Sequence, residues 1–122
     1  MTIRRVVVAV VMLAGCRGAV APPADLVRLV AAETGSLVRM TLVPAAGARI
    51  NARLKPVLEL ADGTRVQFDS QLLTADSAYY AGQPEASMAS RGRIEGTLRV
   101  GVCPAGLDAC LALALPIDIP AP

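Results

Sequence analysis

The stretch that decides the fold is Arg93–Ile119, which reads RIEGTLRVGVCPAGLDACLALALPIDI. On both sides of its two cysteines, large aliphatic residues alternate with small or polar ones, a period typical of β-strands with one buried face. The most regular part of this pattern comprises Leu111, Leu113, Leu115, Ile117 and Ile119. We therefore expect two antiparallel strands, Arg93–Cys103 and Cys110–Ile119, joined by a short loop.

Working outward, the preceding chain consists of short apolar segments separated by turn residues, which is the pattern of an all-β domain. Asp62-Gly63 is a hairpin signal between two of these segments. The expected strands are Leu26–Ala32 (whose spacing would also suit a short helix), Ser36–Val43, Leu54–Leu60 and Arg65–Leu73, with Ala48–Asn51 leading out of a loop. We expect Leu54, Pro56, Leu58 and Leu60 to share one face, Val66, Phe68 and Leu72 to face inward, and Asp76–Ser90 to be a connection. The predicted fold is an immunoglobulin-like antiparallel β-sandwich of about six to seven strands.

Length and composition limit what this fold can do. The chain has 122 residues, enough for one domain, and 54% of them are hydrophobic but only 2% aromatic. The core must therefore consist of small aliphatic side chains, with Phe68, Tyr79 and Tyr80 as its only large rings. There is no histidine, which excludes Ser-His-Asp and Cys-His catalysis and imidazole metal sites. We expect neither a metal nor another cofactor.

The first sixteen residues have the pattern of an export signal. Arg4 and Arg5 form a positive segment, and Val6–Ala14 is an uncharged apolar run, too short for a transmembrane helix of about 20 residues. Leu13-Ala14-Gly15-Cys16 resembles the lipobox of bacterial lipoproteins, in which the cysteine thiol receives a diacylglycerol and becomes the new N-terminus. The alternative is an ordinary secretory signal that happens to contain a cysteine.

The lipobox resemblance implies three segments: a signal peptide over residues 1–15, a lipidated N-terminus and flexible tether over 16–24, and a β-sandwich domain over 25–122. Arg17 follows the cysteine where an Asp would favour retention in the inner membrane, so the outer membrane is expected. Without Arg4 and Arg5, the 12 basic residues fall to ten and balance ten acidic ones. A neutral chain with scattered charge has no basic patch that would bind nucleic acid.

The two remaining cysteines, Cys103 and Cys110, are expected to pair, because an exported domain meets an oxidising compartment. The loop between them holds six residues, and a hairpin of that size can bring opposed Cα atoms within the roughly 4.4–6.8 Å that a disulfide needs. Closing such a loop should stabilise the fold by about 2.5 kcal/mol. The bridge could be a structural staple or a redox pair. No basic residue lies between the cysteines to activate a thiol, and Asp108 would oppose activation.

The stretch Gly96–Pro116 is similar to the end of the N-terminal periplasmic domain of the thiol:disulfide interchange protein DsbD. This resemblance implies an immunoglobulin-like fold and redox cysteines on adjacent strands. Ala48–Asn51 and Tyr79–Gly82 sit where the related domains carry an Asn-containing segment and an aromatic loop. The resemblance also implies an aromatic cap over the disulfide, for which Tyr79 or Tyr80 is the candidate, the alternative being a buried core tyrosine. The cysteine spacing is one residue longer than in that family, and its flanking aromatic residues are missing.

Two functions follow as expectations. The first is a non-catalytic structural or binding module of the cell envelope, anchored to the membrane through Cys16 and stapled by Cys103–Cys110. The second is a periplasmic thiol–disulfide carrier that exchanges electrons at Cys103–Cys110 with a thioredoxin-like partner.

Overall fold

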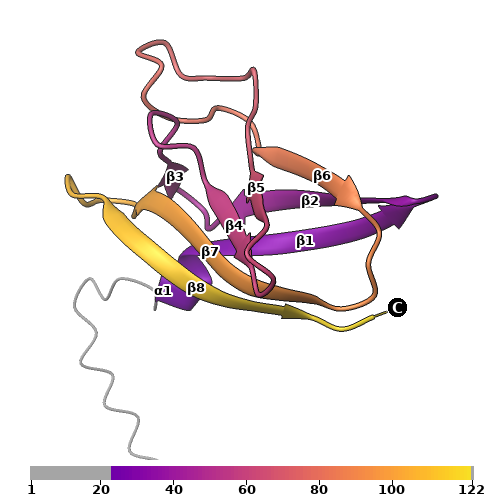
Figure 1. Cartoon of the computed structure of the whole chain (residues 1–122). Coiled ribbons are helices and arrows are strands. Elements are labelled where there is room, and N and C mark those ends of the chain that lie inside the picture. Colours follow the sequence, from indigo (N-terminus) through magenta and orange to yellow (C-terminus); the bar gives the residue numbers. More distant parts are fainter. Residues whose placement is uncertain (1–22, 122) are drawn as a thin grey trace, which may run out of the picture.

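In a computed structural model of the chain, residues 23–121 are described, and they form two antiparallel β-sheets preceded by one helical turn (Figure 1). The elements are α1 (Pro23–Leu26), β1 (Val27–Thr34), β2 (Leu37–Pro44), β3 (Arg49–Ile50), β4 (Val57–Leu60), β5 (Arg65–Gln67), β6 (Glu85–Ala89), β7 (Ile94–Cys103) and β8 (Leu111–Ile119). The predicted leader and most of the predicted tether lie outside these residues. α1 begins at Pro23, two residues before the predicted start of the domain.

β7 is the central strand of the larger, five-stranded sheet. On one side it pairs with β8 over nine residues, from Ile94 opposite Ile119 to Val102 opposite Leu111. On the other side it pairs first with β4 and then, nearer its end, with the two residues of β3, while β5 lies outside β4. The β7–β8 hairpin expected from the sequence is confirmed.

The smaller sheet has the order β1-β2-β6. Side chains from both sheets meet between them, because alternate residues of each strand point to the same face. The buried hydrophobic residues are Leu26, Val27, Val38, Met40, Leu42, Ile50, Leu58, Leu60, Phe68, Tyr80, Ala86, Ile94, Leu98, Val100, Val102 and Cys103. The predicted all-β antiparallel sandwich is confirmed, with eight strands within the described residues instead of six to seven.

Two parts of the strand prediction were wrong for the same reason: a polar side chain bends the backbone. Leu54 is 75% exposed instead of facing inward. The side-chain oxygen of Asn51 accepts hydrogen bonds from the backbone N–H groups of Arg53 and Leu54, so the chain bulges before β4 begins at Val57. Leu72 is likewise 65% exposed, because β5 ends at Gln67 and the backbone N–H of Leu72 donates to the Ser70 hydroxyl.

A further strand was missed. The segment expected to be one connection, Asp76–Ser90, contains β6, which pairs with β2 in the register Met40 to Ala86 and Val38 to Met88. The residues of β6 are small or are good helix formers. Neither their β-propensity nor an alternation of large apolar residues therefore predicts a strand there. The edge of β2 supplies the pairing that holds it in place.

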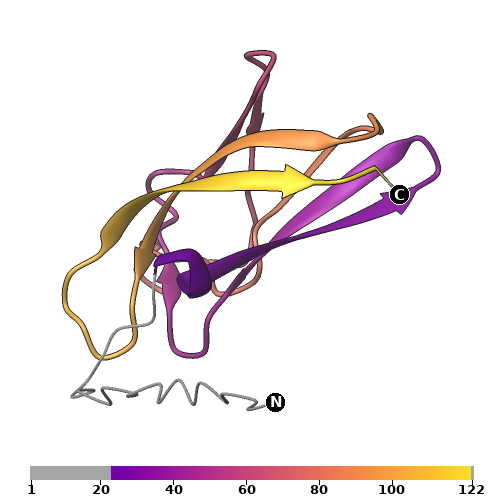
Figure 2. The ribbon, with the colours of Figure 1, turned by 90° about the horizontal axis from the view of Figure 1, so that it is seen from below.

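Different loops and turns lie at the two ends of the sandwich (Figures 1 and 2). The disulfide end consists of α1, the β2–β3 loop 45–48, β3 and the β7–β8 loop 104–110. The opposite end, here the hairpin end, consists of the β1–β2 turn 35–36, the β4–β5 turn 61–64, the β6–β7 connection 90–93 and residues 120–121. In Figure 1 the disulfide end lies on the left and the C-terminus on the right.

Candidate functional site

The disulfide between Cys103 and Cys110 closes the β7–β8 loop, as the sequence predicted. The Cα atoms of the two cysteines are 4.0 Å apart, slightly closer than the expected range. The loop turns tightly at Gly106, whose φ of 75° suits glycine, and the backbone N–H of Leu107 donates to the carbonyl oxygen of Pro104 over 3.3 Å. The bridge therefore fixes the tip of the central hairpin.

The two cysteines have very different access to solvent. Cys103, the last residue of β7, is only 1% exposed and lies next to the buried Val102 and Pro104. Cys110 directly precedes β8 and is exposed. A reactant from solution would therefore meet the bridge from the side of Cys110.

Arg49, on the strand beside Cys103, was not predicted from the sequence to belong to this site. Arg49 of β3 is the direct cross-strand partner of Cys103, so a basic residue lies next to the buried cysteine although none lies between the cysteines. Its guanidinium carbon lies 4.1 Å from the centroid of the Tyr79 ring, which is a cation–π contact. Only the pairing of β3 with the end of β7 brings Arg49 there, and a two-residue strand gives almost no sequence signal.

Tyr79 and Tyr80, the candidates for a cap over the disulfide, have different surroundings. Tyr79 is half-buried, and Asn51 is its isolated bridge partner. It is connected to the cysteine pair through Arg49, which packs on its ring and pairs with Cys103. A cap formed by Tyr79 stays a prediction.

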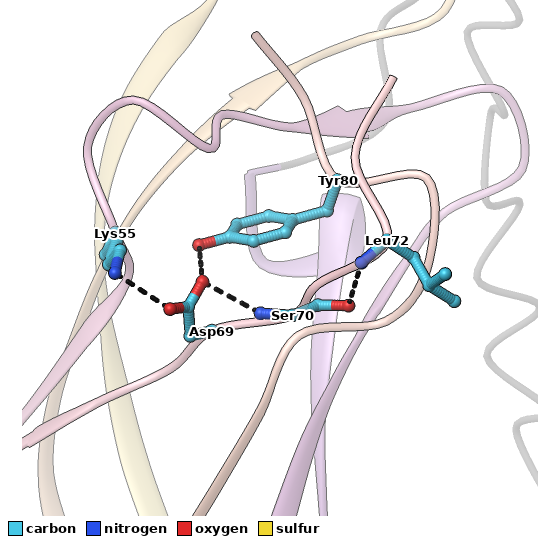
Figure 3. A network of polar contacts seen from close by, with 5 residues as sticks. All are labelled: Lys55, Asp69, Ser70, Leu72 and Tyr80. Atoms are coloured by element: carbon cyan, nitrogen blue, oxygen red, sulfur yellow. Dashed lines mark hydrogen bonds and ion pairs between the residues drawn. The ribbon is translucent and has the colours of Figure 1, made fainter. Parts of the chain in front are cut away.

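Tyr80 is part of the core and of a small polar network (Figure 3). Its hydroxyl donates to the Asp69 carboxylate over 3.3 Å, and the ammonium group of Lys55 donates to the other carboxylate oxygen over 2.8 Å. Burial, together with the negative charge of Asp69, raises the pKa of Tyr80 to about 12. The hydrogen bonds from Lys55 and from the Ser70 backbone lower the pKa of Asp69. This arrangement matches the alternative reading of Tyr80 as a buried core tyrosine.

Within residues 23–121, no group of three or more His, Cys, Asp or Glu side chains could hold a metal ion. In the same part of the chain, no helix combines the length and the apolar character needed to cross a bilayer. The candidate site is the disulfide end, where the Cys103–Cys110 bridge and Arg49 lie together.

A scan against protein-family models and searches of the curated proteins and of the solved structures found no match for this chain. The similarity of Gly96–Pro116 to the DsbD N-terminal domain, and that of Leu13–Cys16 to a lipobox, stay predictions from the sequence.

Proposed function

We propose that this chain is a lipid-anchored module of the bacterial cell envelope, held to a membrane through Cys16, with a non-catalytic structural or binding role. The observation that carries the proposal is the pairing of Cys103 with Cys110. A sulfur atom forms one disulfide, so Cys16 takes no part in this bridge. The export-type segment that precedes Cys16 gives this third cysteine a role of its own, the attachment of lipid.

The test is the covalent state of Cys16 in the full chain produced in a bacterium with two membranes. Intact-mass spectrometry should give a chain that begins at Cys16 and carries a diacylglycerol. A Cys16→Ser variant is the matched control and should carry no lipid. Cleavage elsewhere with an unmodified Cys16 would refute the anchor.

Arg17, directly after the proposed lipid site, supports the outer membrane as the destination. Density-gradient separation of the two membranes should place the chain in the outer fraction. An Arg17→Asp variant should move toward the inner fraction, if the host reads this position as enterobacteria do. Recovery of the unaltered chain in the inner fraction would overturn this part of the proposal.

The exposure difference between the two cysteines favours a second candidate function, a thiol–disulfide carrier. A partner thiolate would attack the sulfur of the exposed Cys110, forming a mixed disulfide and releasing Cys103 as a thiolate. The second thiol of the partner would then displace Cys110, so that the partner leaves as a disulfide and this chain holds two thiols. The positive charge of Arg49 on the neighbouring strand is of the kind that stabilises a leaving thiolate.

The reduction potential of the Cys103–Cys110 pair separates the two candidates. A structural bridge resists reduction and has a potential below about −300 mV, whereas carriers lie well above that value. Equilibration of the purified chain with glutathione buffers, followed by trapping of free thiols, measures it. A potential below about −300 mV would exclude the carrier and leave the structural role.

A further inference from the structure

The segments of the disulfide end form one continuous surface. The backbone N–H of Ala45 donates to the carbonyl oxygen of Leu26 over 2.9 Å, which joins the β2–β3 loop to the end of α1. The same loop touches the β7–β8 loop, because a Cβ atom placed on Gly47 would lie 2.8 Å from the Cβ of Ala105. The start of the fold and the disulfide loop are therefore neighbours at one end of the sandwich (Figure 2).

The length of chain between Cys16 and the fold limits how far this end can lie from the anchor. Seven residue steps separate Cys16 from Pro23, the first residue of α1. Fully extended, seven steps span at most about 25 Å. For the flexible tether expected from the sequence, polymer statistics give a root-mean-square span of roughly 15 Å.

The hairpin end lies farther from α1 than the chain between Cys16 and Pro23 can span. β1 starts next to α1 and runs to Thr34 over eight residues, and β8 runs the same way over nine. At about 3.3 Å per residue, the two ends are separated by roughly 25–30 Å. A lipid on Cys16 therefore holds α1 close to the bilayer and leaves the hairpin end outside the usual reach of the tether.

Apart from the exposed Leu37 at the hairpin end, the loops of the disulfide end are the more apolar of the two ends. The β7–β8 loop is apolar apart from Asp108, and its tip presents Leu107, which is 40% exposed. The β2–β3 loop beside it consists of alanine and glycine. At the hairpin end, in contrast, Arg91 pairs with Asp62 over 2.7 Å and Arg93 pairs with Asp118 over 2.6 Å. Ion-paired side chains of this kind keep a surface hydrated, whereas an apolar loop loses little by leaving water.

Charge does not oppose contact with lipid at the disulfide end. The acidic Asp25 and Asp108 lie there with the basic Arg49, and Arg28 of β1 lies beside Asp25, so the charges of this region balance. Arginine side chains near a headgroup layer can bind phosphate while their stems cover apolar surface.

We propose that the disulfide end of the sandwich lies against the bilayer that holds Cys16, with Leu107 in the headgroup layer. The proposal rests on the lipid anchor proposed above. It assigns a role to the Cys103–Cys110 disulfide, which is to hold the apolar β7–β8 loop in the conformation that contacts the lipid surface. It also means that Cys110 is shielded from large soluble partners while the chain is anchored.

The chain contains no tryptophan, so a single introduced tryptophan reports its own surroundings. The experiment places Leu107→Trp, and separately Leu37→Trp, in the full lipidated chain reconstituted in phosphatidylcholine–phosphatidylglycerol vesicles. Leu37 is the matched control because it begins β2 at the hairpin end and is 51% exposed, more than Leu107. Brominated lipids quench tryptophan on contact. We expect at least threefold stronger quenching at position 107 than at position 37, with a blue-shifted emission at 107 only.

Each outcome bears on the proposal. Equal quenching at the two positions, in a chain whose mass shows the lipid on Cys16, would overturn the orientation and leave the anchor intact. An unmodified Cys16 would overturn both. A blue shift at 107 that depends on protein concentration and not on brominated lipid would show that a second copy covers this end. If Leu107→Trp does not give the β-sheet circular dichroism of the unaltered chain, Ala109→Trp in the same exposed loop replaces it, with the same expected result.

Discussion

Gly47 lies against Ala105, and this contact joins the two loops of the disulfide end. Gly47 has a φ of 77°, and a Cβ placed on it would lie 2.8 Å from the Cβ of Ala105. Neither loop belongs to a regular element, and this close packing adds to the adjacent pairing of Arg49 with Cys103 in fixing their relative position. A glycine is needed there for two separate reasons, backbone conformation and space.

Gly47→Ala should therefore destabilise the domain more than Gly106→Ala. Gly106 has nearly the same φ, 75°, but a Cβ there would meet nothing within 4 Å. The shared backbone penalty is about 1–2 kcal/mol, and the steric contact should add about 1 kcal/mol or more to the Gly47 variant. Urea unfolding of the chain from Arg17 onward, followed by circular dichroism, measures both free energies.

The double variant Gly47→Ala/Ala105→Gly supplies the control, because it removes the Cβ that the new methyl group would meet. We expect it to recover the steric part of the loss and to leave the backbone part. If the two single variants lose the same free energy of unfolding, the loops do not press on each other in solution.

A second glycine matters for the pairing of β4 with β7. Gly96 lies opposite Leu60, and a Cβ on Gly96 would collide with the carbonyl oxygen of Glu59 and lie 2.9 Å from the Cα of Leu60. Backbone cannot move aside without breaking the ladder, so Gly96→Ala should cost about 3 kcal/mol or more.

Gly101→Ala is the control for that loss. It lies on the same strand, and the nearest atom that its Cβ would meet is the Cβ of Asn51, at 3.2 Å. It should cost about 1 kcal/mol in the same urea experiment, less than Gly96→Ala, because a shift of a few tenths of an ångström relieves a contact of 3.2 Å. Equal losses for the two variants would mean that the β4–β7 register differs from the one described.

Contacts such as those of these glycines could not be predicted from the sequence. The alternation of Leu111–Ile119 reflects a face that packs against the core, where Leu113, Leu115, Ile117 and Ile119 are partly buried and Leu111 is exposed, and it predicted β8 to within one residue. The roles of Gly47 and Gly96 depend on chain segments far away in the sequence, which no local pattern contains. The same holds for Arg49, which neighbours Cys103 only through a two-residue strand. The cysteine pair was predictable because two cysteines remain once Cys16 is set aside for the expected lipobox, whereas the surroundings of each sulfur were not.

The Cys103–Cys110 bridge should stabilise the fold mainly by restricting the unfolded chain. Removal of both sulfurs by Cys103→Ala/Cys110→Ala should lower the free energy of unfolding by about 2.5 kcal/mol. Dithiothreitol should lower the stability of the unaltered chain by a similar amount and leave that of the double variant unchanged. A loss below about 0.5 kcal/mol would show that the bridge adds little to the fold, which would weaken the structural role.

The β4–β5 turn should lose stability in acid because of Asp62. Asp62 accepts a hydrogen bond from the backbone N–H of Thr64 over 2.8 Å and one from Arg91 over 2.7 Å. These bonds, the one from the Thr64 backbone first, lower the pKa of Asp62 from 3.8 to about 2. A carboxyl whose pKa is lower in the folded state binds its proton more readily in the unfolded chain. Its stabilising effect is therefore complete above the unfolded pKa and is lost as the pH falls from 3.8 to about 2.

An Asp62→Asn variant keeps an oxygen that can accept the Thr64 hydrogen bond but has no proton to gain. The difference in free energy of unfolding between the two chains should be constant above the unfolded pKa of 3.8 and shrink as the pH falls toward 2. The other carboxyl groups titrate in both chains and cancel in that difference. A carbon-detected NMR titration of the Asp62 carboxyl gives the midpoint directly. A midpoint near 3.8 would contradict the prediction, because the turn hydrogen bonds would then not favour the charged form.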